Sequence, residues 1–261
     1  MKVVVVNSRR LVLLLVLGFM FLSGLVVLNL AHLGEDRSVW PVLGAGRRLP
    51  IYSVMTEDKK AALTFDAAWG ASRTPAILDT LDEYEVRSTF FLVTFWIEDY
   101  PEVAQEIAER GHELGLHSST HPNFTELPDS EIKQELERNI QTIKDTTDQR
   151  PQLFRPPFGA YDDRVVKVIE DDMNLTTIQW SVDSLDWQDL TAEKMAQRVL
   201  EQIHPGAIVL FHNNGLHTPE ALPLIIEELQ KQGYELVPVS ELLHSGDYHV
   251  DHQGRQVPGS P

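Results

Sequence analysis

The sequence contains no cysteine and few basic residues. Without cysteine the chain has no disulfide framework, no thiolate metal site and no cysteine nucleophile. Lysine and arginine number 22 against 39 acidic residues, which gives a formal net charge of −17. Three of the basic residues, Lys2, Arg9 and Arg10, precede the first acidic one, so the rest of the chain carries a net charge of −20. A surface this acidic repels phosphate backbones, so we expect no nucleic-acid partner, whereas neutral or cationic glycans are acceptable ligands.

Long apolar runs are also lacking, with one exception near the N-terminus. Residues 11–30 are uncharged and almost wholly apolar, and about 20 such residues cross the hydrocarbon core of a bilayer. Basic residues precede this run and none follows it closely, which predicts a cytoplasmic segment over 1–10, a transmembrane anchor over 11–31 and an extracytoplasmic remainder of a single-pass cell-membrane protein. The alternative is a cleaved signal peptide, but the run is long for one and "LNLAHLG" lacks a clear small-x-small cleavage site.

The rest of the chain divides into three predicted parts. Residues 32–57 contain several Gly and Pro with little periodicity, which indicates a tether. Residues 58–243 are long enough for one domain with a sizeable core. The final residues, 244–261, are polar with Gly and Pro, and we expect them to form a flexible tail.

Within residues 58–243, short apolar runs alternate with amphipathic stretches. The apolar runs predict strands at 60–65, 88–93, 113–116, 151–154, 175–180, 207–211 and 234–237. The amphipathic stretches predict helices at 74–85, 101–110, 129–146, 162–171, 191–203 and 218–232. This alternation predicts an α/β fold with a parallel sheet, either a barrel or a barrel with one gap; an open doubly wound sheet is the alternative.

Polar, reactive side chains follow five of the predicted strands. Asp66 ends the first, His117 and His121 follow the third, Arg155 follows the fourth, "SVDSLDW" follows the fifth and His212 follows the sixth. The carboxyl ends of parallel strands meet on one face of a barrel, where enzymes of this architecture keep their sites. This distribution predicts an enzyme.

Each of these residues also has an ordinary structural interpretation. Asp66 alone could cap the following loop. His117 and His121 are four residues apart, so one helical turn would point both imidazoles toward a metal, but the spacing alone is weak. Arg155, before two prolines, could be a surface residue, or it could lower the pKa of a neighbouring carboxylate and orient it.

The last strand end and the nearby aromatic residues leave similar alternatives. His212 could be a buried core histidine, or Asp186 or its neighbour Asp183 could orient it and raise its pKa, which would make it a proton donor near neutrality. The aromatic residues Trp69, Trp187 and Phe158 could be plain packing or could form the walls of a groove for sugar rings.

Taken together in this order, "TFD", "HSSTHP", "RPPFGAY", "DSLDW" and "LFH" resemble the motifs of the polysaccharide deacetylases (the NodB-homology domain, carbohydrate esterase family 4). The resemblance covers about residues 58–243. The form "TFDAAWG" is similar to the sporulation-associated subgroup. The resemblance implies a distorted (β/α) barrel of seven strands that removes N-acetyl groups from the amino sugars of cell-wall glycan, either peptidoglycan or a chitin-like polymer.

The resemblance also implies a role for each matching residue. These roles are Asp66 as general base, His117 and His121 as ligands of zinc or another divalent metal, Arg155 as the residue that holds Asp66, a backbone N–H near Phe158 in the oxyanion hole, Asp186 as the residue that tunes the general acid His212, and Trp187 as part of the substrate groove.

One position departs from the family pattern. The usual motif has a second aspartate directly after the base, where it completes an Asp-His-His metal site, and this sequence has Ala67. A methyl group cannot bind a metal, and two histidines with water bind a divalent ion more loosely than two histidines and a carboxylate. Three outcomes remain open: Asp66 or another residue joins the ligands, a two-histidine site suffices, or the domain only binds glycan.

The sequence therefore predicts a metal-assisted polysaccharide N-deacetylase that is anchored in the membrane and acts on wall glycan. Its rival is a non-catalytic glycan-binding or scaffold protein of spore or envelope assembly, which Ala67 favours. The retained base and acid speak against that rival, because a binding protein needs neither. Glycoside hydrolysis by Asp66 with Asp183 or Asp186 is a third interpretation, but it leaves the histidines without a role.

Overall fold

The computed structural model describes residues 47–260. The predicted cytoplasmic segment and transmembrane anchor, over 1–31, and the first part of the tether lie outside these residues. Among residues 47–260, no helix has both the length and the apolar character needed to cross a bilayer.

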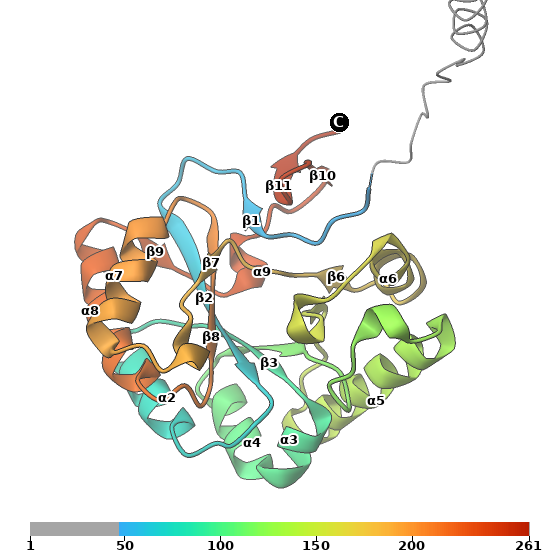
Figure 1. Cartoon of the computed structure of the whole chain (residues 1–261), viewed down its shortest axis with the longest axis horizontal. Coiled ribbons are helices and arrows are strands. Elements are labelled where there is room, and N and C mark those ends of the chain that lie inside the picture. Colours follow the sequence, from blue (N-terminus) through green and yellow to red (C-terminus); the bar gives the residue numbers. More distant parts are fainter. Residues whose placement is uncertain (1–46, 261) are drawn as a thin grey trace, which may run out of the picture. The chain divides into compact units, whose positions relative to one another are not determined.

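The centre of the fold is a curved sheet of mostly parallel strands (Figure 1). Its parallel strands are β2 (Lys60–Ala67), β3 (Thr89–Leu92), β4 (Glu113–Leu116), β5 (Leu153–Phe154), β6 (Thr176–Thr177), β7 (Val182–Asp183), β8 (Ala207–His212) and β9 (Glu235–Leu236). Their main order is β8-β2-β3-β4-β5-β6, with β7 beside β8 and β9 beside β2. The predicted α/β architecture with a parallel sheet is confirmed, as an incomplete barrel.

Strands β2 and β8 form the longest parallel pairing of the barrel. Every residue of β2 except Lys60 is buried, as are the first five residues of β8. Strands covered on both faces read as continuous apolar runs, which is why the sequence reveals them clearly. Their parallel register places Asp66 opposite His212, so the fold itself brings two of the predicted site residues together.

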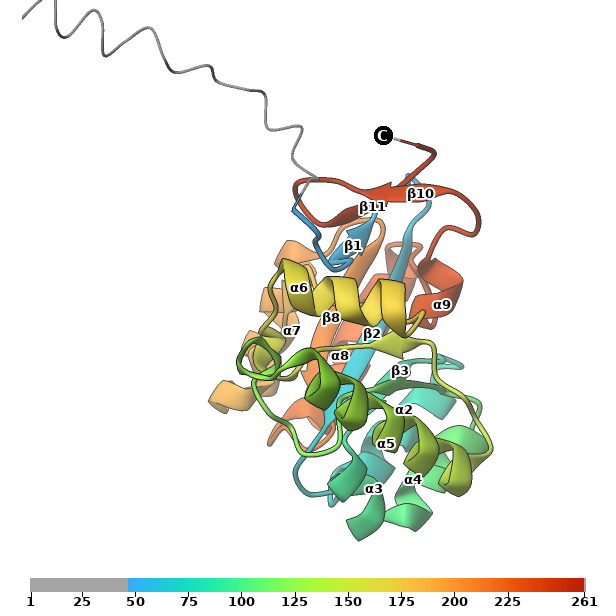
Figure 2. The same cartoon turned by 90° about the vertical axis from the view of Figure 1, so that its right-hand side faces the viewer.

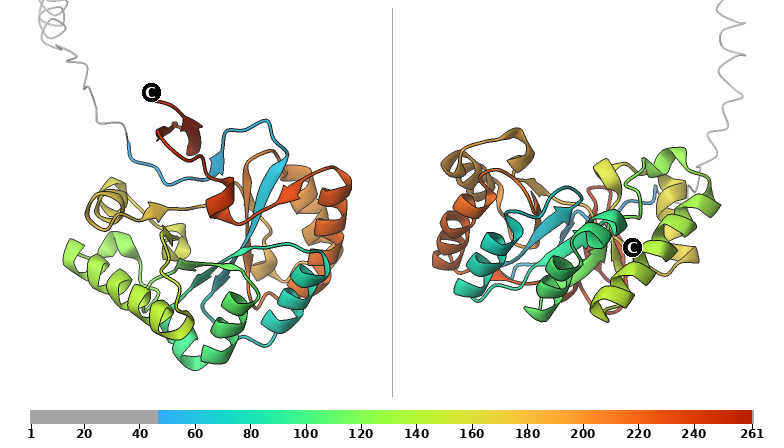
Figure 3. Two further views of the ribbon diagram at one scale, coloured as in Figure 1. Left: turned by 180° about the vertical axis from the view of Figure 1, so that it is seen from behind. Right: turned by 90° about the horizontal axis from the view of Figure 1, so that it is seen from below.

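Helices cover the outer side of this sheet, as the views from behind and below also show (Figure 3). They are α2 (Thr74–Glu83), α3 (Thr94–Asp99), α4 (Pro101–Glu109), α5 (Asp129–Thr147), α6 (Asp163–Lys167), α7 (Ala192–Gln202), α8 (Thr218–Lys231) and α9 (Val239–Leu242). Proline in the first turn of α2, α4 and α8 favours their starts. The predicted helix over 162–171 is divided, because α6 gives way to a π-helical turn at Val168–Asp172.

The two ends of the described chain meet at one edge of the sheet (Figure 2). β1 (Ser53–Val54) pairs with β8 and with β11 (Arg255–Pro258), which also pairs with β10 (Tyr248–Val250). Ile51, just before β1, forms a further parallel bridge with Ile178. Residues from 51 onward, expected in the tether, therefore belong to the folded domain and lie in the gap between β6 and β8.

The prediction of a flexible tail over 244–261 is wrong for the described residues. Residues 248–258 form a hairpin instead, and Gln256 within it is buried and accepts a hydrogen bond from the His244 backbone N–H at 2.8 Å. At the hairpin turn, Gly254 has φ +77°, and an added Cβ would come within 2.4 Å of the Tyr52 ring. The strands are short and polar, so periodicity does not reveal them. Backbone pairing of β10 with β11, and of β11 with β1, holds them in place.

Candidate active site

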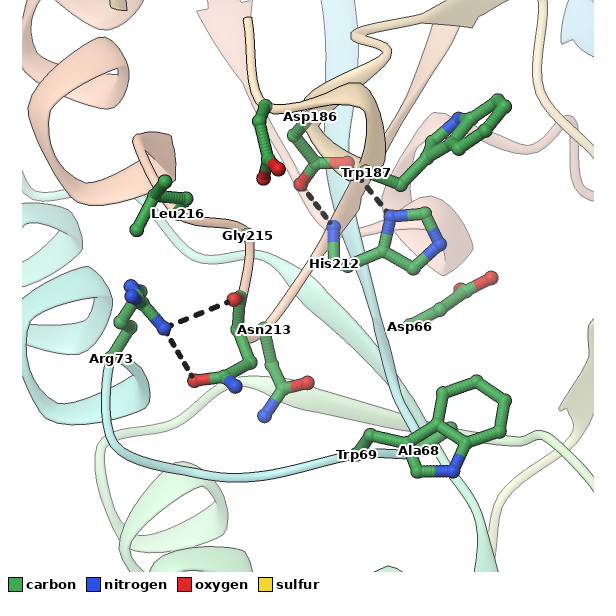
Figure 4. Close-up of a pocket in the computed structure, with 12 residues that line it drawn as sticks. Asp66, Ala68, Trp69, Arg73, Asp186, Trp187, His212, Asn213, Gly215 and Leu216 are labelled. Atoms are coloured by element: carbon green, nitrogen blue, oxygen red, sulfur yellow. Dashed lines mark hydrogen bonds and ion pairs between the residues drawn. The ribbon is translucent and has the colours of Figure 1, made fainter.

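The predicted strand-end residues converge on two adjoining cavities. The smaller, of about 130 Å³, is lined by Asp66, His117, His121 and His212, among others. The larger, of about 450 Å³, shares Asp66 and His212 with it and also includes Asp186 (Figure 4). The prediction that these side chains, far apart in the sequence, meet at one face of the sheet is confirmed.

Asp66 is held by a buried ion pair. Arg155 is fully buried, and its Nη1 donates to Asp66 Oδ1 at 2.7 Å. The guanidinium lies 4.1 Å from the centroid of the Phe91 ring and donates through Nη2 to the Gln179 carbonyl oxygen at 3.1 Å. Burial is the largest influence on Asp66 and would raise its pKa, but the charge of Arg155, its hydrogen bond and the nearby His117 and His212 together outweigh burial and lower that pKa. Asp66 therefore stays ionised, as a general base requires.

His212 is held by a second buried carboxylate. Asp186 Oδ1 accepts from His212 Nδ1 at 2.7 Å, and Oδ2 accepts from the His212 backbone N–H at 2.7 Å and from Thr218 Oγ1 at 2.9 Å. Because Nδ1 donates to Asp186, the Nε2 atom is left for the cavity. Burial lowers the pKa of His212, but its hydrogen bond to Asp186 and the charge of that residue raise the pKa above its ordinary value.

These contacts decide between Asp186 and Asp183 as the partner of His212. Asp183 Oδ1 instead accepts the backbone N–H of Leu185 at 2.8 Å. Asp186 is thus committed to His212, and Asp183 lines neither cavity, so neither is placed to act with Asp66 on a glycosidic bond.

The two candidate metal ligands lie together but not on a helix. They follow β4 in a loop in which Ser118 and His121 have positive φ, so the one-turn helix invoked for their spacing is absent. His117 Nδ1 donates to the Arg155 carbonyl oxygen at 2.7 Å, which leaves Nε2 facing Asp66 Oδ2 at 3.6 Å. Burial is the main cause that lowers the pKa of His117, and it also lowers the pKa of His121 to about 4. Both rings are neutral at pH 7, the form that binds metals.

The donors present do not complete the metal centre that the family implies. Within residues 47–260, no group of three His, Cys, Asp or Glu side chains is arranged to hold an ion. Ala67 is fully buried and contributes only a methyl group. The oxygen of Asp66 that does not face His117 is bound to Arg155. The predicted two-histidine arrangement is present, and a third ligand from the described residues is not.

Three aromatic side chains border the cavities and are exposed. The exposed fractions are 62% for Trp69, 70% for Phe158 and 59% for Trp187. Trp69 and Phe158 pack against the His121 ring, with centroid distances of 4.7 and 4.6 Å. Phe158 also has φ 59°, a left-handed conformation that is strained for a bulky residue. Large exposed rings around a cavity suit the apolar faces of sugars.

Several supporting residues were missed by sequence reasoning. Asn139, buried in α5, accepts from the His117 backbone N–H at 3.1 Å and donates to the Leu92 carbonyl oxygen. Gln179 Nε2 donates to the carbonyl oxygen of Gly159 at 3.0 Å. Asn213 Nδ2 joins the two loops after β2 and β8 through Gly70 O at 2.8 Å. The signal in the sequence was an amide side chain at a core position, but a single sequence does not identify the group to which such an amide is hydrogen-bonded.

Comparisons with known proteins agree with this geometry. A family model described as polysaccharide deacetylase matches residues 53–177. The uncharacterized protein YlxY of Bacillus subtilis is 32% identical over 194 residues, which cover 74% of this chain and 60% of YlxY. The peptidoglycan-N-acetylmuramic acid deacetylase PdaA of Bacillus subtilis is 32% identical over 192 residues, which cover 72% of this chain and 73% of PdaA.

A solved structure gives the same result. The crystal structure of BA3943, described as a CE4 family pseudoenzyme from Bacillus anthracis, matches with a TM-score of 0.71 and 40% identity, covering 74% of this chain and 68% of that one. This chain spans 60% of the length of YlxY, so shared domains do not mean shared whole proteins. The resemblance seen in the motifs is confirmed, and the chain belongs to the polysaccharide deacetylases of carbohydrate esterase family 4, a family of hydrolases.

Proposed function

We propose that this domain binds the N-acetylated amino sugars of cell-wall glycan and hydrolyses their N-acetyl groups, with Asp66 as base and His212 as acid. The observation that carries the proposal is the pair formed by these two residues. They lie opposite each other on adjacent strands, line the same two cavities, and are each bound to a buried partner of opposite charge.

The reaction follows from the protonation states of this pair. Asp66, kept ionised by Arg155, takes a proton from a water molecule, and the oxygen of that water attacks the acetyl carbonyl carbon. The resulting tetrahedral species collapses when the Nε2–H of His212 protonates the amide nitrogen and the C–N bond breaks. The products are acetate and a free amino sugar. The described donor set, with only two of the expected ligands, does not fit a catalytic metal ion.

The substrate class and the location belong to the same proposal. PdaA is named a peptidoglycan deacetylase, and the exposed aromatic residues at the cavities suit sugar rings. The apolar run over residues 11–31 supports a single-pass membrane anchor, with the domain on the side where wall glycan lies. The similarity of "TFDAAWG" to the sporulation-associated subgroup supports a role in making the spore or cell envelope.

A second candidate function is glycan binding without turnover. Two observations favour it: Ala67 stands where the family pattern has a metal-binding aspartate, and BA3943, at 40% identity, is described as a pseudoenzyme. Binding would use the same cavities and aromatic rings, while the acid and base would have no work to do.

Acetate release by the full chain separates the two functions. The substrates are N-acetylated peptidoglycan and chitin oligomers, with zinc added or chelated, and the variant is His212→Ala. Release by the wild type that falls by about 100-fold or more in His212→Ala supports hydrolysis, since a general acid contributes about 10²- to 10⁴-fold. Glycan binding without any acetate, equal in wild type and variant, supports the binding protein.

A further inference from the structure

The larger cavity extends past the acid and base to an arginine with no assigned role. Arg73, at the start of α2, lines it together with Asn214 and Leu216 from the loop after β8. In Figure 4, Arg73 lies on the side of the pocket away from Asp66, with Asn213 between them. A ligand whose acetyl group reaches Asp66 and His212 would extend other substituents toward Arg73.

The guanidinium of Arg73 is held at one edge and open at the other. Its Nη1 atom donates to both the backbone oxygen and Oδ1 of Asn214, each at 3.4 Å. Within residues 47–260 no carboxylate lies within ion-pair distance of it, and no hydrogen bond uses its Nη2 or Nε atoms. An arginine fork with two free donors fits a carboxylate in a bidentate manner.

Asn214, which accepts the hydrogen bonds of Arg73, is itself held in place by neighbouring residues. Its Oδ1 also accepts from Ser72 Oγ at 3.2 Å. Gly70 has φ +65°, and a Cβ there would come within 2.5 Å of the Asn214 amide nitrogen, so only glycine allows this close approach. The loop after β2 and the loop after β8 therefore lock together around Arg73.

The charge around the cavity makes Arg73 the preferred contact for an anionic group of a ligand. Arg155 is buried beneath the cavity floor and bound to Asp66, which leaves Arg73 as the one arginine or lysine that lines either cavity. Asp189 lines the same cavity, and the domain as a whole is strongly acidic. Apart from the acid His212, Arg73 is thus the one cationic side chain that an anionic group can reach in this cavity.

We propose that Arg73 and Asn214 form a carboxylate subsite, so that the domain prefers glycans whose amino sugars carry a carboxylate over neutral ones. This inference rests on the proposed glycan-directed function and adds a substrate class to it. The carboxylate has two sources in wall glycan: the lactyl ether of muramic acid, or a stem peptide attached to it. Both offer the same chemistry to the guanidinium.

Binding measurements on the full chain test this subsite without relying on turnover. The ligands are a neutral chitin oligomer, a muramic acid oligomer with free lactyl carboxylates, the same oligomer with those carboxylates amidated, and one that carries stem peptides. The variants are Arg73→Gln, Arg73→Lys and the control Arg87→Gln. Arg87 is exposed and paired with Glu241, so its replacement makes the same change in net charge outside the cavities.

Arg73→Gln is expected to weaken binding of the free lactyl oligomer by about tenfold, the size of one charge-assisted pair at a half-exposed site. Binding of the neutral and amidated oligomers changes less than twofold, Arg73→Lys recovers part of the loss, and Arg87→Gln has no selective effect. A loss confined to the oligomer that carries peptides supports the subsite and places its carboxylate in the stem.

Two outcomes overturn the inference in distinguishable ways. If Arg73→Gln weakens neutral and acidic oligomers equally, or neither, the carboxylate subsite is wrong while the glycan function stands. If the wild type binds none of the oligomers, the proposed function fails and the subsite fails with it.

Discussion

The acid–base half of the site, Asp66 and His212, is held by stronger contacts than the metal half, His117 and His121. Asp66 and His212 are each bound at 2.7 Å to a buried partner of opposite charge. In the metal half, His117 is held by two hydrogen bonds, but the His121 ring is placed chiefly by packing against Trp69 and Phe158. Ala67 supplies no ligand at all. The groups that move protons are therefore fixed more firmly than the groups that would hold an ion.

Arg155 connects the two halves. Its guanidinium holds Asp66 and its carbonyl oxygen holds His117. Neither contact involves residue 67, whose methyl group is simply buried in the core. The loss of the metal-binding carboxylate therefore leaves the base, the acid and the first histidine in place. An incomplete metal site therefore need not disturb the acid–base pair beside it.

The largest effect is expected from Asp66→Asn, which removes the base and keeps the shape of the side chain. Acetate release should fall by about 10³-fold, because general-base catalysis contributes about 10²- to 10⁴-fold. The matched control is Asp99→Asn, an exposed aspartate at the end of α3 that lines neither cavity; it should retain activity within about threefold, since a surface substitution away from the site has little effect. Thermal unfolding of both variants is needed, because Arg155 loses its counter-charge in the first. Equal losses in the two variants would contradict the role of Asp66.

The next effect is a gain, from Ala67→Asp. A third ligand beside His117 and His121 should raise zinc content to one ion per chain and raise acetate release by about 100-fold, since a bound metal lowers the barrier by several kcal/mol. Without zinc the new buried carboxylate is unpaired and should lower the melting temperature, and zinc should restore it.

Ala67→Asn is the control for that gain, because it has the same size and no charge. It should not respond to zinc. If Ala67→Asp binds no more zinc than the wild type, the position of residue 67 relative to the histidines is not that of a ligand, and the contrast between the two halves of the site disappears.

The sequence predicts the firmly built half better than the rest. Buried strands such as β2 and β8 are continuous apolar runs, so the residues that end them, Asp66 and His212, are easily placed. The loop that carries His121 is not predicted, because its positive φ angles depend on tertiary contacts rather than on local preference. The hairpin at the C-terminus and the contacts of the Asn139 amide are not predicted for the same reason, since pairings between distant residues leave no periodic signal.

Asp186→Asn tests the coupling inside the acid–base half through pH. Asp186 raises the pKa of His212, so His212 stays protonated as the pH rises and activity falls only when the pH passes this raised pKa. Without the negative charge the pKa drops, and the alkaline limb of the activity profile should move toward lower pH, so that activity is lost chiefly on the alkaline side. Asp189→Asn, which changes an exposed carboxylate of the same loop, should leave the limb in place. An unchanged limb in Asp186→Asn would show that His212 is not the acid.

The smallest effect is expected from replacing one exposed tryptophan beside each half of the site. Trp69 packs on His121 and Trp187 borders only the larger cavity, and they are exposed to similar extents, 62% and 59%. Replacing either with alanine should raise KM for a glycan oligomer by about fivefold, because a stacking wall is lost. Trp69→Ala should also weaken zinc binding, since His121 loses one of the rings that orient it, while Trp187→Ala should leave zinc binding unchanged. Equal zinc affinities in the two variants would mean that packing by Trp69 does not position His121 for a metal ion.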